Sequence, residues 1–132
     1  MPKPNASTES IAYPFACFTS YRSYVKRAAC LLYGIQDLKV DKNQPHVLKY
    51  SGSHKGVELH HDKSEFTINL MLSRSNAYAG GGTYFPDAGE NVRLEFGEFL
   101  LHPGVAVHSG TPISDGSRYL MVIFADEKRS MH

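Results

Sequence analysis

Tryptophan is absent from these 132 residues, and cysteine occurs only twice, at Cys17 and Cys30. Two cysteines are too few for the disulfide framework of a small secreted domain, so we expect two reduced, largely buried thiols in a helical N-terminal region. A disulfide between them is the alternative. Neither cysteine lies at a metal-binding spacing from a second cysteine, which argues against a zinc site built on thiolates.

The chain also has no large charge excess and no long apolar run. A formal net charge of +1 gives no electrostatic reason to expect nucleic acid or a membrane surface as a partner. No stretch approaches the roughly 20 apolar residues of a membrane-spanning helix. Residues 1–7 lack the apolar core of a secretory signal, which predicts a cytoplasmic location. An excised catalytic domain of a longer protein is the alternative.

Length and composition predict one globular domain over residues 1–132, with an arm and supporting helix in 1–45 and a β core in 46–126. A helix is expected from Ser20 to about Tyr33, ended by Gly34, because apolar residues recur there at steps of three and four. The apolar face of this helix consists of Tyr21, Tyr24, Val25, Ala28, Leu31 and Leu32. Residues 36–45 are expected to be a polar connection.

From residue 46 onward the pattern is that of short strands separated by glycine and proline turns. The expected strands cover residues 46–50, 57–61, 65–73, 83–85, 92–94, 96–102, 105–108 and 117–125. So many short strands favour a mainly β sandwich or jelly roll, with the helix packed outside it.

His60, Asp62 and His108 form the most informative pattern. Residues at i and i+2 on a strand share a face, so His60 and Asp62 can reach one ion while His61 points away. His108, at the end of a distant strand, would complete two imidazoles and one carboxylate. That set leaves metal positions open and suits non-heme Fe(II). The alternative is a polar strand end with solvated side chains.

Arg118 lies on the last strand, at the same parity as three apolar residues, Leu120, Val122 and Phe124. If it points into the fold, its buried guanidinium needs a partner, which a small dicarboxylic acid would supply. If it points outward, it is an ordinary solvated arginine.

Three further residues are candidates to contact the small dicarboxylic acid expected at Arg118. Tyr50, at a strand end, can donate a hydrogen bond to it or serve as an aromatic plug with a wet hydroxyl. Thr67 and Asn69 lie on the polar side of an apolar strand, and each either contacts the acid or bonds to backbone or water. His102 is a rival metal ligand, but its position before Pro103-Gly104 favours a structural role. Gly80 to Gly82 lack the Lys-Ser/Thr of a phosphate loop and favour close backbone approach instead.

Five segments together resemble the catalytic domain of procollagen lysyl hydroxylases and, more broadly, the prolyl 4-hydroxylase superfamily. They are residues 60–70, 78–85, 101–104, 108 and 116–126. The resemblance implies a double-stranded β-helix, with His60, Asp62 and His108 holding Fe(II) and Arg118 anchoring 2-oxoglutarate. Tyr50, Asn69 and Thr67 are carried along as further cosubstrate contacts.

The resemblance also implies a reaction: hydroxylation of prolyl or lysyl residues in a polypeptide with O2, releasing succinate and CO2, with L-ascorbate as a candidate further cofactor. A homodimer is a candidate assembly. One departure is Leu120, where several branches of the superfamily have serine. The alternatives are a small-molecule hydroxylase, a nucleic-acid demethylase with the same metal ligands, and a non-catalytic jelly-roll binding module.

Overall fold

The computed structural model describes residues 21–35, 37–40 and 45–128. The first elements are α1 (Tyr21–Tyr33), β1 (Leu38–Val40), β2 (His46–Tyr50), β3 (Val57–His60), β4 (Phe66–Met71) and a short 3-10 turn, η2 (Ser75–Ala77). They are followed by β5 (Tyr78–Gly80), β6 (Thr83–Phe85), β7 (Glu90–Val92), β8 (Phe99–Pro103), β9 (His108–Gly110), β10 (Ile113–Gly116) and β11 (Arg118–Glu127).

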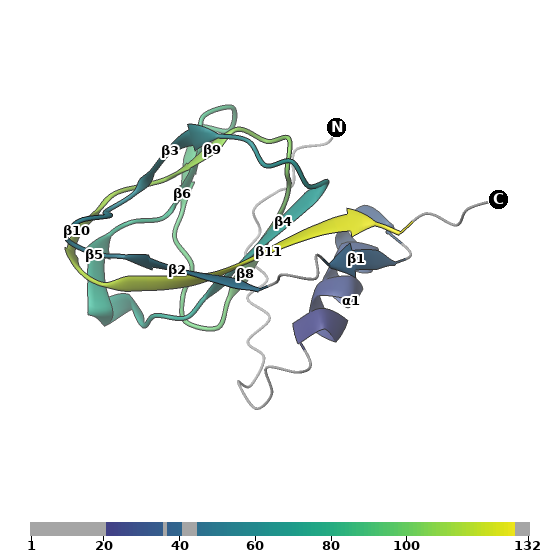
Figure 1. The fold of residues 1–132 in the computed structure, drawn as a ribbon, viewed down its shortest axis with the longest axis horizontal. Coiled ribbons are helices and arrows are strands. Elements are labelled where there is room, and N and C mark those ends of the chain that lie inside the picture. Colours follow the sequence, from purple (N-terminus) through teal and green to yellow (C-terminus); the bar gives the residue numbers. More distant parts are fainter. Residues whose placement is uncertain (1–20, 36, 41–44, 129–132) are drawn as a thin grey trace.

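The strands form three sheets. The largest has the order β1-β11-β4-β8, and β2 also pairs with β11. A four-stranded sheet has the order β3-β9-β6-β7, and β5 pairs with β10. Figure 1 shows β3, β9 and β6 on one side and β2, β11, β8 and β4 on the other, with β10 and β5 closing one end. This arrangement confirms the predicted mainly β jelly roll.

Strand β11 separates two cores because its side chains alternate between the faces of the large sheet. Met121, Ile123 and Ala125 pack with Ala29 of α1 on the outer face. Leu120 and Val122 face inward and belong to a second cluster of buried side chains, which lies between the sheets. Arg118 has the inward parity, so the local pattern of β11 alone places its guanidinium inside the fold.

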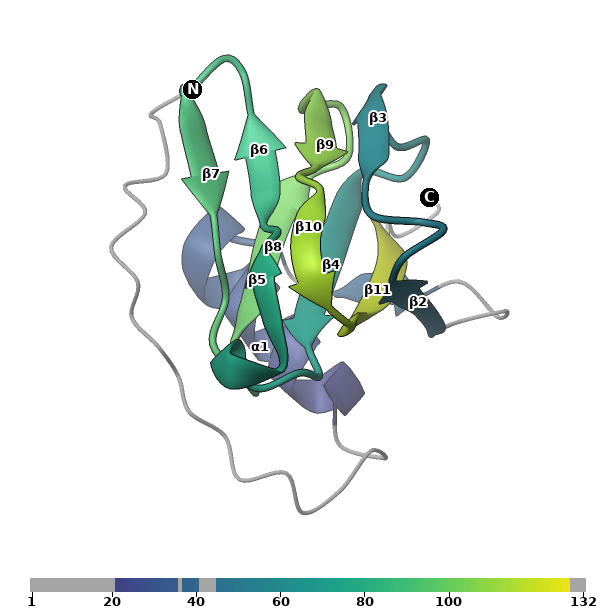
Figure 2. The ribbon, with the colours of Figure 1, turned by 90° about the vertical axis from the view of Figure 1, so that its left-hand side faces the viewer.

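Helix α1 lies outside the strands, as predicted (Figure 2). Gly34 follows it with a φ of 67°, and the Gly34 amide donates to the Cys30 carbonyl at 3.0 Å. In the described part of the chain, no helix has the length and apolar character needed to cross a membrane.

The apolar face expected for α1 is not its buried face at Leu31 and Leu32, which are 71% and 67% exposed, whereas Ala29 is fully buried. The helix meets the sheet through a small residue, which allows close approach. Cys30 is free and exposed rather than buried. Two predictions lie outside the described residues, namely the arm and the state of Cys17. The same holds for the other side chains of the expected apolar face of the helix. That remainder consists of Tyr21, Tyr24, Val25 and Ala28.

Strands β1, β5 and β10 were not predicted. Strand β1 lies within the expected polar connection, and its register with β11 aligns Leu38 with Glu127. Each of these strands has three or four residues, too few for alternation to be recognised, and each is held by its partner strand.

Candidate metal and anion site

Strand pairing brings the two histidines of the predicted triad together. His60, the last residue of β3, is the Cα partner of His108, the first residue of β9. Asp62 lies beyond the end of β3, so strand parity does not orient it; its amide donates to the Gly104 carbonyl at 2.8 Å. One ligand atom from each of His60, Asp62 and His108 lies within 4.8 Å of the other two.

The tautomers of both histidines suit metal binding. Nδ1 of His60 lies 2.7 Å from the Glu58 carbonyl oxygen, and Nδ1 of His108 lies 2.7 Å from the Ala106 carbonyl oxygen. Because a carbonyl oxygen only accepts, each Nδ1 carries the hydrogen, and in the neutral ring each Nε2 presents a lone pair.

Those lone pairs face the Asp62 carboxylate. Nε2 of His60 is 3.4 Å from Asp62 Oδ1, and Nε2 of His108 is 3.4 Å from Asp62 Oδ2. Lone pairs and carboxylate oxygens at this separation repel one another unless a proton or a metal ion lies between them. Two imidazole nitrogens and one carboxylate are a donor set that fits a divalent first-row metal with open positions. The role of these residues as ligands stays a prediction.

The site is sealed on one side and open on the other. The Asp62 and His108 side chains are only 9% and 8% exposed, whereas the His60 side chain is 40% exposed. A bound metal would therefore be reached from the side of His60.

Thr67 has a different contact from those predicted for it. Its buried hydroxyl donates to Asp62 Oδ2 at 2.6 Å. The bond leaves Oδ1 free of this contact and fixes the orientation of the carboxylate, so Thr67 would position Asp62 if this carboxylate holds a metal.

Replacing Thr67 with valine should lower the affinity for a divalent first-row metal about 10- to 100-fold. Valine keeps the shape of the side chain but cannot donate to Asp62. Calorimetric titration with Mn(II) measures the change, and Thr67→Ser, which keeps the hydroxyl, should restore most of the affinity. Equal affinities for the valine variant and the wild type would refute the positioning role.

Arg118 has the second informative environment. The residue is 1% exposed, and its Nε, NH1 and NH2 atoms are buried without a hydrogen-bond partner among the described residues. Its guanidinium carbon lies 5.0 Å from the centre of the Tyr50 ring, which comes from the paired strand β2. Burial lowers the pKa of Arg118, while Tyr50 and Tyr78 act to raise it. A buried guanidinium with free donors is suited to binding an anion, and this role of Arg118 stays a prediction.

Two tyrosines complete the surroundings of Arg118. Tyr50 is buried, and burial raises the pKa of its hydroxyl, which keeps it a hydrogen-bond donor. Tyr78 is also buried, and its hydroxyl lies close enough to the Arg118 guanidinium to raise the pKa of Arg118. The guanidinium carbon of Arg93 lies 4.6 Å from the centre of the Tyr78 ring.

Sequence reasoning missed Tyr78 because its short strand, β5, was not recognised. The signal available was the glycine run that follows it. A Cβ at Gly81, where φ is 75°, would lie 3.2 Å from Tyr78 Cε2 and 3.4 Å from Arg118 Cδ. The expected close approach of backbone at these glycines is therefore present, and it occurs over the anion site.

Strand β9 connects the two halves of the site. His108 begins this strand, and Gly110 ends it; a Cβ at Gly110 would lie 3.1 Å from Tyr50 Oη. Residues at i and i+2 on a strand are about 7 Å apart. That distance is comparable to the length of a short dicarboxylic acid. Asn69 is buried on the inward face of β4, and its contact with such an acid stays a prediction.

His102, which the sequence favoured as a structural histidine, lies directly beside the triad. Its ring centre is 4.5 Å from that of His108 and 5.2 Å from that of Phe85. Nδ1 donates to the Pro103 carbonyl at 2.8 Å, while Nε2 is buried without a partner. Burial is the main cause that lowers the pKa of His102, to about 4, so the ring is neutral at pH 7.

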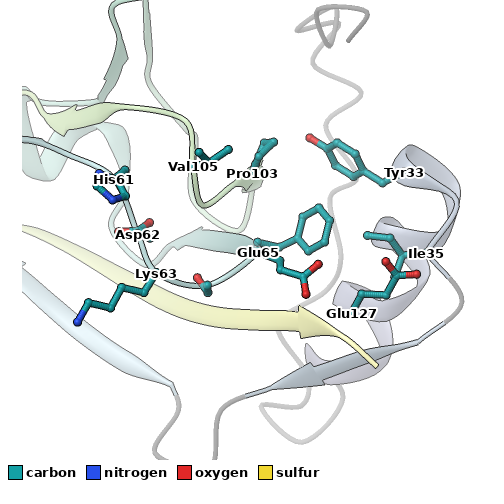
Figure 3. Close-up of a pocket in the computed structure, with 11 residues that line it drawn as sticks. Tyr33, Ile35, His61, Asp62, Lys63, Glu65, Pro103, Val105 and Glu127 are labelled. Carbon is teal, nitrogen blue, oxygen red and sulfur yellow. The ribbon is translucent and has the colours of Figure 1, made fainter. Parts of the chain in front are cut away.

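A groove of about 670 Å³ begins at Asp62 and runs toward the end of α1 (Figure 3). Its walls are largely apolar and are formed by Tyr33, Ile35, Phe66, Pro103 and Val105. In Figure 3, Asp62 and His61 lie at one end, and Tyr33, Ile35 and Glu127 lie at the other.

Comparisons with known proteins find relatives that are similar over part of this chain. Mouse procollagen-lysine,2-oxoglutarate 5-dioxygenase 1 is 44% identical over 71 residues, which cover 51% of this chain and 10% of the mouse protein. The human type 2 protein is 37% identical over 87 residues, which cover 61% of this chain and 12% of that protein. The chain thus spans about a tenth of the length of these relatives.

The fold has a counterpart among solved structures. The viral collagen prolyl hydroxylase of Paramecium bursaria Chlorella virus-1, in its 2OG complex, matches with a TM-score of 0.69 and 12% identity, over 89% of this chain and 77% of the viral one. No family model matches the chain. Over these 71 to 87 residues the sequence is thus similar to the procollagen-lysine dioxygenases, and the fold matches that of the viral collagen prolyl hydroxylase.

Proposed function

We propose that this protein is an Fe(II)- and 2-oxoglutarate-dependent dioxygenase that hydroxylates prolyl or lysyl residues of a polypeptide. The observation that carries the proposal is the unpartnered, buried guanidinium of Arg118 in the same interior as His60, Asp62 and His108. The names of the relatives support the choice of cosubstrate.

Each residue of the site has a separate proposed role. His60, Asp62 and His108 would hold the iron, and the backbone carbonyls that accept from the two Nδ1 atoms keep both rings turned toward it. Arg118 would bind the distal carboxylate of 2-oxoglutarate, with Tyr50 and Tyr78 as further donors. When bound, Fe(II) would supply the oxidising chemistry with O2, and 2-oxoglutarate would be consumed to give succinate and CO2. The chain's own contribution is to orient these groups and exclude water.

The test is succinate formation in the presence of Fe(II), 2-oxoglutarate, ascorbate and a library of peptides that contain lysine or proline. We expect succinate to form only with iron, and mass spectrometry to find peptides that gained one oxygen atom. His108→Ala should lose both signals. If the wild type and His108→Ala form equal succinate, the enzyme proposal fails.

A further inference from the structure

Arg93, the residue after β7, is exposed, yet its guanidinium is held by one neighbouring segment. Nε donates to the Gly80 carbonyl at 3.1 Å, and NH2 lies 3.3 Å from the carbonyl oxygens of both Ser75 and Tyr78. The guanidinium carbon also lies over the Tyr78 ring, 4.6 Å from its centre, in a cation–π contact. Exposed arginines are ordinarily solvated, so this set of contacts with residues 75–80 indicates a specific role for Arg93.

Two of the carbonyls that Arg93 bonds belong to a strand with a single partner. Strand β5 pairs with β10, and in the described part of the chain no further strand joins this pair. Carbonyls at i and i+2 of a strand point to the same edge, and Tyr78 and Gly80 stand in this relation. The planar guanidinium presents several donors in a fixed fork, so it can bond to both carbonyls at once. Arg93 therefore supplies donors that a second neighbouring strand would otherwise supply, and it fixes the backbone of Tyr78.

Tyr78 links Arg93 to the surroundings of Arg118. A Cβ at Gly81 would lie within 3.4 Å of both the Tyr78 ring and the Arg118 side chain, so these two side chains pack against the same residue. Tyr78 acts to raise the pKa of Arg118, whereas the charge of Arg93 acts to lower it, so both lie within electrostatic reach of the Arg118 guanidinium. Because hydrogen bonds weaken steeply as their angle departs from linearity, a small shift of Tyr78 would lower the affinity for an anion at Arg118.

We propose that Arg93 is a positioning residue for the cosubstrate: it fixes Tyr78 so that the tyrosine hydroxyl can donate to 2-oxoglutarate bound at Arg118. The inference rests on the proposed function, which it deepens by adding a residue that acts through Tyr78. Arg93 acts by its geometry, because the ring contact and the bonds to the backbone carbonyls together need a planar fork of donors. Lysine, a compact point charge, cannot reproduce that arrangement.

Two substitutions of Arg93 separate geometry from charge. Arg93→Met removes the charge and the donors, whereas Arg93→Lys keeps the charge without the fork. Because Arg93 is exposed, the fold should tolerate both changes, and thermal unfolding checks this. The matched control is Arg74→Met, at an exposed arginine whose guanidinium carbon lies 4.8 Å from the centre of the Phe96 ring. This control removes a cation–π contact that does not involve Tyr78.

The readout is ligand affinity, which does not require turnover. The full chain is titrated by calorimetry with Mn(II) and then with 2-oxoglutarate, in the absence of O2. We expect Arg93→Met to bind 2-oxoglutarate about 5- to 10-fold more weakly, the effect of losing one hydrogen bond from Tyr78, and to keep its Mn(II) affinity. Arg93→Lys should bind 2-oxoglutarate about 3- to 5-fold more weakly than the wild type, and Arg74→Met should match the wild type.

A double-mutant cycle with Tyr78→Phe identifies the route. Tyr78→Phe removes the hydroxyl that Arg93 positions, so adding Arg93→Met to it should cause less than about a 2-fold further loss. Three results would overturn the inference: additive losses in the cycle, wild-type affinity for 2-oxoglutarate in Arg93→Met, and wild-type affinity in Arg93→Lys. All three leave the proposed function standing. If the wild type itself bound no 2-oxoglutarate, the proposed function would fall together with the inference.

Discussion

Replacing Arg118 with methionine should weaken 2-oxoglutarate binding by at least about 30-fold and leave metal binding nearly unchanged. Removing one partner of a buried, hydrogen-bonded charge pair costs about 2–5 kcal/mol, which corresponds to a loss of this size. The metal ligands are unaffected because they come from β3, β9 and the turn after β3, whereas Arg118 begins β11. Calorimetric titration with Mn(II), and then with 2-oxoglutarate, separates the two affinities.

The same variant should fold at least as well as the wild type in the absence of 2-oxoglutarate. Methionine occupies a similar volume, and it removes a buried guanidinium without hydrogen-bond partners, whose burial costs about 1–3 kcal/mol. Arg74→Met, at an exposed arginine, is the matched control and should bind 2-oxoglutarate normally. Equal loss of metal and 2-oxoglutarate affinity in Arg118→Met would contradict the assigned role.

Replacing Asp62 with alanine should have the second large effect, a loss of at least about 100-fold in metal affinity. Asp62 is the only anionic member of the cluster, and without it two neutral imidazoles remain. Because 2-oxoglutarate would bind partly through the metal, Asp62→Ala should lose affinity for 2-oxoglutarate as well. Arg118→Met, by contrast, should lose affinity for 2-oxoglutarate but keep its affinity for the metal. Titration with Mn(II) followed by 2-oxoglutarate records both changes.

Asp87→Ala provides the control for Asp62, because Asp87 is an exposed carboxylate in the turn after β6. This variant should bind metal as the wild type does. Unchanged metal affinity in Asp62→Ala would show that the cluster of His60, Asp62 and His108 is not the metal site.

Much of the β core could be predicted because alternation is a local property. The expected strands at 46–50 and 83–85 match β2 and β6 in both bounds, and the others overlap β3, β4, β7, β8, β9 and β11. The exposure of Leu31 and Leu32 could not be predicted, because helical periodicity identifies apolar positions but not which of them the sheet covers.

The sequence by itself determined the parity of β11, which puts Arg118 on the face of Leu120 and Val122, because side chains alternate along any strand. It also placed His108 at a strand end, but as the last residue of a strand over 105–108, whereas His108 is the first residue of β9. Only the tertiary structure decided which side chains meet across strands. The bond from Thr67 to Asp62, the approach of Tyr78 to Arg118, and His102 beside His108 all depend on the pairing of distant segments. Such pairing brings together residues far apart in the chain, and no local pattern encodes it.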